Sequence, residues 1–549
     1  MKTRKYFNLF IVLVFLAISY PAKLPARALL AASPVSNAAA AQPIGHPDVP
    51  TDQIILKYRS PEIMNGLPGP VQAGELQRLS AAAGLTLQVV RHMSGDAQVL
   101  RLPERLPAGQ VRLIARRLAA LPEVAYAEPD LILQHTLLPN DPQYPSQWHY
   151  LAPSAGNYGI NAPAAWDITT GAASVVVAVI DTGITNHADL SGRTLPGYDF
   201  IHDDLVANDG DGRDADPGDP GDWITSAENS SGYFAGCGVS DSSWHGTHTA
   251  GTVGAASNNG LGVAGVNWNS KILPVRVLGK CGGYFSDIVD GMRWAAGLSV
   301  GGVPDNPNPA QVLNLSLGGF GPCDSTPQNA INAITAAGTT VVVSAGNSNA
   351  DAGGFTPANC NGVITVAATN RDGGRAFYSN YGATVEISAP GGAQGFGNDP
   401  NGVLSTLNTG TLGPLADTYV YYQGTSMAAP HVSGVASLLY SLDPALAPAQ
   451  VLQILQDTVT HFPLGSTCNT SICGSGIVNA GAAVQLVSSA PTNTPTATPT
   501  NTPTATGTNT PTPTATFTPT PTPTKTPTPT ATAKPAGASN TAYLPIVLR

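Results

Sequence analysis

The feature that most constrains the fold is a set of short runs of β-branched residues that end in glycine or a polar residue. Residues 174–181 read SVVVAVID and are followed by Thr182 and Gly183. Residues 312–319 read VLNLSLGG, and residues 340–347 read TVVVSAGN. Uninterrupted apolar runs of this kind are typical of strands that are buried on both faces, as in parallel sheets. The runs predict an α/β fold with a mainly parallel sheet flanked by helices.

Polar side chains stand at the ends of these runs and at the starts of helical patterns. Asp181 ends the first run, where open α/β sheets place their functional sites. His245 opens a stretch of small residues whose glycines permit close backbone approach. Ser426 precedes an apolar helical pattern, so it lies at a helix N-terminus where unpaired N–H groups favour negative charge.

Each of these residues also has an ordinary structural explanation. Asp181 could cap a turn, His245 could be a buried structural histidine, and Ser426 could be a helix N-cap. Asn347, which ends another strand, could be a turn residue. Together, however, they supply an acid, a base, an amide donor and a hydroxyl. A serine hydroxyl becomes a good nucleophile when a base takes its proton and fixed dipoles hold the oxyanion.

The order Asp, His, Asn, Ser resembles that of the subtilisin-like serine proteases (subtilases), over roughly residues 139–487. The resemblance implies that Asp181, His245 and Ser426 form a catalytic triad and that Asn347 donates to the oxyanion. It also implies that the second histidine of the His-Gly-Thr-His motif, His248, is structural. The expected activity is hydrolysis of peptide bonds through an acyl-enzyme.

Two segments resemble the parts of this family that bind the substrate backbone. One is Ser316, Leu317, Gly318 and Gly319, and the other contains Gly283. An extended peptide held between two such segments would add a strand, so that backbone hydrogen bonds supply affinity and side-chain pockets supply preference. Glycines that merely form turns are the alternative interpretation.

Composition adds further limits. The chain has 549 residues, too many for one compact domain, and a net charge of -10 with no basic patch or arm. We therefore expect no nucleic-acid partner. Protein or peptide substrates are the expected partners, and we expect a monomer.

The first residues read as a targeting segment. A basic start at residues 2–5 precedes an apolar run at 7–18, which is too short for a comfortable membrane span. We assign residues 1–41 to a secretory signal peptide, with small-residue cleavage sites at 26–28 and 39–41 both left open. An uncleaved anchor is the alternative. Neither this segment nor any other predicts a membrane span in the mature form.

Cysteine usage agrees with secretion. The six cysteines all lie in the region expected to be catalytic, and an oxidising compartment would pair them. The favoured pairs are Cys468–Cys473, which closes a short loop, and Cys323–Cys360, which brackets a helix and a strand whose ends can meet. The two cysteines that remain give the third pair, Cys237–Cys281, and both lie near site motifs. Zinc binding is the alternative, but no suitable spacing of cysteine and histidine supports it.

Residues 42–136 form a separate unit before the peptidase domain, which we place at 137–488. The unit has strand patterns at 53–58 and 97–102 and helical patterns at 73–83 and 109–120. It resembles the ferredoxin-like, α+β propeptide of subtilases, which assists folding and blocks the site until it is cut. The chain's own propeptide is therefore expected as an inhibitory partner. An ordinary additional domain is the alternative.

After the peptidase domain the composition changes abruptly. Residues 489–540 are dominated by Pro-Thr repeats, which cannot bury a core and are expected to be an extended, disordered linker. A glycosylated stalk is the alternative. A short tail at 541–549 follows, and attachment to the cell surface through it is a second hypothesis beside free secretion.

Calcium is the one cofactor expected, in a structural role. The family resemblance implies a site made by Asp189, Asn259 and the carbonyls of Leu261 and Val263. A loop that contains Asp209, Asp211 and Asp214 packs carboxylates and glycines together, as Ca²⁺ prefers, although a solvated acidic loop explains it equally simply.

Two rival functions remain. An esterase of the α/β-hydrolase type would carry Gly-x-Ser-x-Gly and a histidine after the acid near the end of the chain. Here residues 424–428 read GTSMA, and both acid and base precede Ser426. An inactive protease-like module is the second rival, and the occupation of every catalytic position argues against it.

Overall fold

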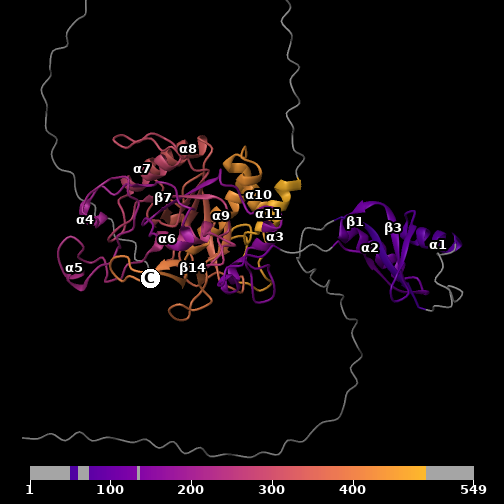
Figure 1. The fold of residues 1–549 in the computed structure, drawn as a ribbon. Helices are drawn as coiled ribbons and strands as arrows, with labels where there is room; N and C mark the ends of the chain where they lie inside the picture. Colours follow the sequence, from indigo (N-terminus) through magenta and orange to yellow (C-terminus); the bar gives the residue numbers. More distant parts are fainter. Residues whose placement is uncertain (1–49, 60–72, 133–136, 490–549) are drawn as a thin grey trace, which may run out of the picture. The chain divides into compact units, whose positions relative to one another are not determined.

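The computed structural model describes residues 50–59, 73–132 and 137–489 (Figure 1). The expected signal peptide, the linker after residue 489 and the C-terminal tail lie outside these residues. Within the described ranges, no helix is both long and apolar enough to cross a membrane.

The N-terminal unit is a four-stranded sheet with two helices. Its elements are β1 (Thr51–Tyr58), α1 (Ala73–Ala83), β2 (Gln88–Met93), β3 (Ala97–Leu106), α2 (Ala108–Ala119) and β4 (Val124–Pro129). The strand order is β2-β3-β1-β4, and all neighbours are antiparallel. Buried apolar residues of both helices and of the sheet form one core. The expected helices lie within a residue of their predicted bounds, whereas β2 had not been singled out.

The larger unit is built on a seven-stranded parallel sheet. In spatial order its strands are β13 (Ile387–Pro390), β12 (Ile364–Thr369), β10 (Thr340–Ser344), β8 (Val312–Leu315), β5 (Val176–Asp181), β7 (Lys271–Arg276) and β6 (Tyr198–Asp199). The three runs with which the sequence argument began are therefore adjacent, as β5, β8 and β10. Strands β8 and β10 end before their runs do, at Leu315 and Ser344, and the residues that follow leave the sheet, whereas β5 starts later than its run and extends to Asp181.

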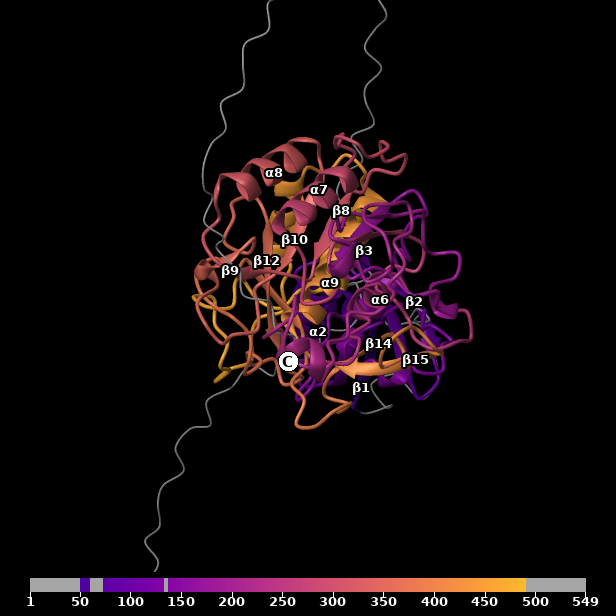
Figure 2. The same ribbon diagram turned by 90° about the vertical axis from the view of Figure 1, so that its left-hand side faces the viewer.

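Helices cover both faces of this sheet, as the β-branched runs predict. Alternate residues of β5 belong to two cores: Val177 and Val179 pack with α6 (His245–Gly254) and α9 (Thr425–Leu442). Ala178 and Ile180 pack with α7 (Phe285–Ala295) and α8 (Ser325–Ala336) on the other face. Figure 2 shows α7 and α8 together, with the strands between them and α9.

Smaller elements complete the domain. An antiparallel hairpin of β14 (Val403–Asn408) and β15 (Asp417–Tyr422) packs against α6. A two-stranded pair joins β9 (Gly319–Phe320) to β11 (Phe355–Thr356). The remaining helices are α3 (Ala162–Trp166), α4 (Asp204–Ala207), α5 (Ser226–Ser230), α10 (Pro448–Asp457) and α11 (Ala480–Ser489), and the short 3₁₀ turns are η2 (Tyr144–Ser146), η3 (Trp148–Tyr150), η4 (Ala188–Leu190) and η5 (Ala352–Gly354).

All six cysteines are paired in disulfides. The bonds join Cys237 to Cys281, Cys323 to Cys360 and Cys468 to Cys473. These are the three pairs that the sequence analysis favours. With every cysteine in a disulfide, none is left to act as a zinc ligand.

Three histidines are buried against one another beneath the sheet edge. His149 and His431 share a hydrogen bond of 2.7 Å between Nδ1 and Nε2, and His431 Nδ1 donates to the Met427 carbonyl. His248 is fully buried and stacks on Tyr422. Burial lowers the pKa of His431 to about 4 and that of His248 to about 3, and it also lowers the pKa of His149. All three are therefore neutral in the folded protein.

We expect the protein to lose stability as the pH falls below about 6.5, where unfolded histidines take up protons but these three cannot. Each contributes a loss of about 1.4 kcal/mol per pH unit until its own folded pKa is reached. Thermal unfolding of the Ser426→Ala chain between neutral and acid pH measures the effect without self-cleavage. His431→Gln should flatten the dependence, whereas His461→Gln, at an exposed site, should not. A melting temperature that is independent of pH would contradict the prediction.

Candidate active site

Asp181 is fixed at the carboxyl end of the central strand β5. Its carbonyl accepts hydrogen bonds from the backbone N–H groups of Val277 and Leu278. The side chain is fully buried, and Oδ1 accepts from the Thr182 backbone N–H at 2.8 Å. The Thr249 hydroxyl lies 3.4 Å from Oδ2. A buried carboxylate needs such donors, and here the strand end and the helix together supply them.

His245 is the first residue of α6, and its imidazole faces this carboxylate. Nδ1 of His245 lies 2.7 Å from Oδ1 of Asp181. The helix can start so close to the strand because residue 246 is glycine: a Cβ there would lie 2.1 Å from the Gly183 carbonyl oxygen. Burial lowers the pKa of His245, but Asp181 and the more distant Asp222 raise it, and the net shift is upward.

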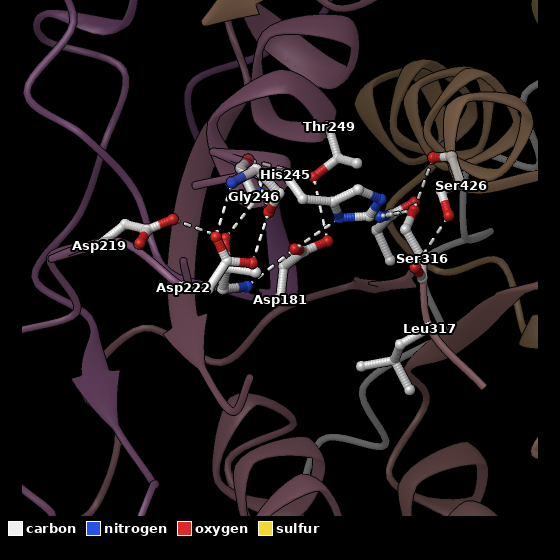
Figure 3. A network of polar contacts seen from close by, with 12 residues as sticks. Asp181, Asp219, Asp222, His245, Gly246, Thr249, Ser316, Leu317 and Ser426 are labelled. Carbon is white, nitrogen blue, oxygen red and sulfur yellow. Dashed lines mark hydrogen bonds and ion pairs between the residues drawn. The ribbon is translucent and has the colours of Figure 1, made fainter. Parts of the chain in front are cut away.

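Ser426 is the second residue of α9 and lies on the far side of the imidazole from Asp181 (Figure 3). Its hydroxyl donates to the Ser316 carbonyl at 3.1 Å, and the Ser316 hydroxyl donates back to the Ser426 carbonyl at 2.8 Å. Among the described residues, Nε2 of His245 has no hydrogen-bond partner. A rotation of the Ser426 side chain would turn its hydroxyl from Ser316 toward that nitrogen.

Asn347 follows β10 and is held beside the start of α9. Its Oδ1 accepts from both the backbone N–H and the hydroxyl of Thr425, at 2.8 and 2.9 Å. These two bonds fix the plane of the amide. The Nδ2 group therefore has a set direction beside Gly424, and the residue is solvent-exposed. A fixed, accessible amide N–H of this kind is available as a hydrogen-bond donor.

The two segments expected to bind the substrate backbone differ from each other in burial and in secondary structure. Ser316 and Leu317 follow β8 and are buried, whereas Gly318 is half-buried. Gly319 belongs to β9 and pairs with Thr356. Gly283 is exposed just before α7, and a Cβ there would lie 2.1 Å from the Val277 carbonyl.

Several supporting residues were not found by the sequence argument. Thr182 and Ser243, each next to or near a triad residue, are themselves held by the carboxylates of Asp219 and Asp222. The only sequence signal for them is the position of two hydroxyl residues beside the motifs. Asp219 and Asp222 lie in a loop, and a loop has no repeating pattern of apolar residues from which its position could be predicted.

At the first expected calcium site, the side-chain oxygens of Asp189 and Asn259 accept hydrogen bonds from protein N–H groups. Asp189 is fully buried, and its two carboxylate oxygens accept from the Asn259 amide and the Val263 backbone N–H, both at 2.9 Å. Asn259 Oδ1 in turn accepts from the Leu261 N–H at 2.8 Å. A cation needs these oxygens for itself. In this arrangement the side-chain oxygens that the resemblance assigns to calcium accept from these protein N–H groups instead.

The acidic loop is also bonded within the protein. Asp209 forms an ion pair with the buried Arg276, and Asp214 accepts from the Asp216 backbone N–H at 2.8 Å. Asp211 is exposed. Across the described ranges, no group of three or more His, Cys, Asp or Glu side chains is placed to hold a metal ion. Calcium takes no part in the proposed reaction.

The fold and the site together define a class of protein. An acid, an imidazole and a hydroxyl brought together at the carboxyl ends of a parallel sheet are the arrangement of hydrolases that use serine as nucleophile. The sequence model of the subtilase family matches residues 172–505. The chain belongs to the subtilase family.

Individual relatives agree with this. The chain is 48% identical over 405 residues to an extracellular protease of Xanthomonas campestris pv. campestris, covering 74% of this chain and 66% of the relative. It is 45% identical over 409 residues to an extracellular basic protease of Dichelobacter nodosus, covering 74% and 65%. The chain thus spans slightly less than two thirds of the length of these two curated relatives. A solved protease structure from Pseudoalteromonas arctica is 54% identical, with a TM-score of 0.60, and the match covers 64% of this chain and 99% of that one.

We expect EDTA to leave the melting temperature of the unprocessed Ser426→Ala chain unchanged, because protein donors already bond both Asp189 oxygens and, among the described residues, no group of three or more His, Cys, Asp or Glu side chains is placed to hold a metal ion. Differential scanning calorimetry of the Ser426→Ala chain with and without EDTA measures this. A drop in melting temperature that added CaCl₂ restores would contradict the expectation. Such a drop would mean that the 259–263 loop rearranges around an ion.

Proposed function

We propose that the chain is a secreted serine endopeptidase, made as a self-inhibited zymogen. The observation that carries the proposal is the 2.7 Å hydrogen bond between His245 and Asp181, with Ser426 on the other side of the imidazole. Membership of the subtilase family supports it. Ser426 is the nucleophile, His245 the general base, and Asp181 the orienting acid.

The reaction proceeds in two displacements. His245 Nε2 takes the Ser426 proton as Oγ attacks the peptide carbonyl carbon, and the imidazolium then gives that proton to the leaving amine. The C–N bond breaks, and an acyl-serine remains. A water molecule repeats the sequence, with His245 again as base, and releases the carboxylic acid. Asp181 keeps the proton of the neutral imidazole on Nδ1 and stabilises the imidazolium.

Asn347 is the side-chain donor to the tetrahedral oxyanion. Its amide plane is set by Thr425 before the substrate arrives, so no reorganisation is needed when charge develops. The backbone N–H of Ser426, at the first turn of α9, is the second donor, and the helix dipole favours the same charge.

The substrate binds as an added strand. The segment of Ser316, Leu317, Gly318 and Gly319 supplies one edge, and the segment with Gly283 supplies the other. Glycine at 283 lets that backbone approach closely, since any side chain there would meet the Val277 carbonyl. Pairing through the backbone suits protein and peptide substrates of varied sequence.

Secretion and inhibition complete the proposal. Two relatives are extracellular proteases, and the paired cysteines suit an oxidising compartment. The unit of β1 to β4 is the inhibitory propeptide, and the chain acts after cleavage near residue 137. The rival hypothesis of an α/β-hydrolase esterase finds no support, because acid and base both precede Ser426 in the chain.

Replacement of Ser426 by alanine should abolish peptidase activity and self-processing. The wild-type protein should be secreted with an N-terminus between residues 137 and 147, whereas Ser426→Ala should keep the 42–136 unit. N-terminal sequencing and labelling with a fluorophosphonate measure both. A Ser426→Ala protein that still cleaves casein would show that another nucleophile acts.

Replacement of Asn347 by alanine should lower kcat by about 10²–10³ with little change in KM, which is the loss measured when this kind of donor is removed in subtilisin. Ser348→Ala is a matched control, because Ser348 is the exposed neighbour and its backbone N–H, not its hydroxyl, bonds to Asn380. A KM effect alone would contradict the role of Asn347 in the transition state.

A further inference from the structure

Two carboxylates stand beside the triad and take no part in the mechanism above. Asp219 and Asp222 both come from the loop between α4 and α5. Asp219 is buried and Asp222 is half-buried, on the side of Asp181 away from Ser426 (Figure 3). Buried carboxylates are costly unless they serve as acceptors, so their bonding partners indicate what they do.

Asp219 connects the end of β5 to the start of α6. Its Oδ2 accepts from the Thr182 hydroxyl at 2.7 Å, and the same hydroxyl oxygen accepts from the Gly246 backbone N–H at 3.0 Å. Because Asp219 takes the hydroxyl proton, a lone pair of Thr182 is turned toward the helix. Thr182 also donates its backbone N–H to Asp181. One carboxylate thus holds the two backbone segments that carry the acid and the base.

Asp222 holds the chain on the other side of His245. Its two oxygens accept from the backbone N–H and the hydroxyl of Ser243, at 2.6 and 2.7 Å. The Ser243 hydroxyl oxygen in turn accepts from the His245 backbone N–H at 3.3 Å. The residue between them, Trp244, has a left-handed φ of 49°, so the backbone makes a sharp turn here that the Ser243 bonds stabilise.

We propose that Asp219 and Asp222 are positioning residues of this peptidase: Asp219 fixes Thr182 against α6, and Asp222 fixes Ser243 against His245 and places a negative charge beside the imidazole. The proposal rests on the triad assigned above. It gives the 215–225 loop a role in the reaction, although neither carboxylate touches the substrate.

The surrounding charges agree with this role. The charges that act on His245 are those of Asp181 from β5 and of the two loop carboxylates, and the neutral His248 lies near it on its own helix. The neutral Tyr422 from β15 lies near Asp222, and Arg276 from β7 lies near Asp219. Burial raises the pKa of both loop acids, and Asp222 raises that of Asp219 further. Asp222 contributes more than Asp219 to the raised pKa of His245, so the electrostatic part of the role is assigned to Asp222.

The test compares pH profiles of kcat/KM on a peptide amide substrate for the full chain after processing. In Asp222→Asn the acidic limb should move to lower pH by about half a unit or more, because the imidazole loses a stabilising negative charge. The kcat on the plateau should fall several-fold with little change in KM. Asp222→Glu should keep the wild-type limb.

Asp241→Asn is the matched control. It removes the same charge from an exposed residue four positions before His245. In about 1 M NaCl, where the Debye length is ~3 Å, its limb should coincide with that of the wild type. An Asp222→Asn limb that also coincides with the wild type would overturn the electrostatic part, as would an equal shift in Asp241→Asn.

Ser243→Ala and Thr182→Val separate geometry from charge. Both retain the carboxylates but cut their links to α6, so kcat should fall while the limb stays in place. They also keep the proposal testable if Asp222→Asn does not fold. Wild-type kcat in both would overturn the positioning role. Fluorophosphonate titration counts the active sites in each preparation, and only an active Ser426→Ala protein would count against the triad itself.

Discussion

The site depends on one buried hydrogen bond, between Nδ1 of His245 and Oδ1 of Asp181. An ionised carboxylate with no exposure to water is costly unless donors surround it. Here the donors come from two elements: Thr182 at the end of β5 and Thr249 within α6. The bond can therefore form only if helix and strand meet closely, and Gly246 against Gly183 is what allows that approach.

The parallel sheet then brings the other groups to the same edge. Because β5, β8 and β10 are adjacent and point the same way, the residues that follow them emerge side by side. Ser316 follows β8 and bonds reciprocally with Ser426, and Asn347 follows β10 and bonds with Thr425. Helix α9 is thus fixed at its first turn by two neighbouring strand ends, which sets the positions of both Ser426 and Asn347, the proposed nucleophile and oxyanion donor.

The buried strands and the residues at their ends are the parts of the fold and the site that could be predicted from the sequence. A strand buried on both faces has a strong signal in its β-branched run, and a chemically unusual residue at the end of such a run is visible as a motif. The hairpin of β14 and β15 was not foreseen, because the buried β14 mixes polar with apolar residues and β15 is only half-buried, so neither carries a comparable run. The calcium ligands at Asp189 and Asn259 were expected from the family resemblance, but whether Asn259 turns its oxygen or its nitrogen toward Asp189 depends on packing that no spacing encodes.

The histidines show what separates a catalytic side chain from a structural one in this fold. His245 and His248 lie on the same helix and are both buried, and burial alone lowers the pKa of each. His248 faces a carbonyl and an aromatic ring, so nothing offsets that effect and it stays neutral. His245 faces carboxylates, which reverse the shift, so that its pKa is raised. The sequence motif places two histidines on α6, and the acids that surround only one of them single out His245 as the proposed base.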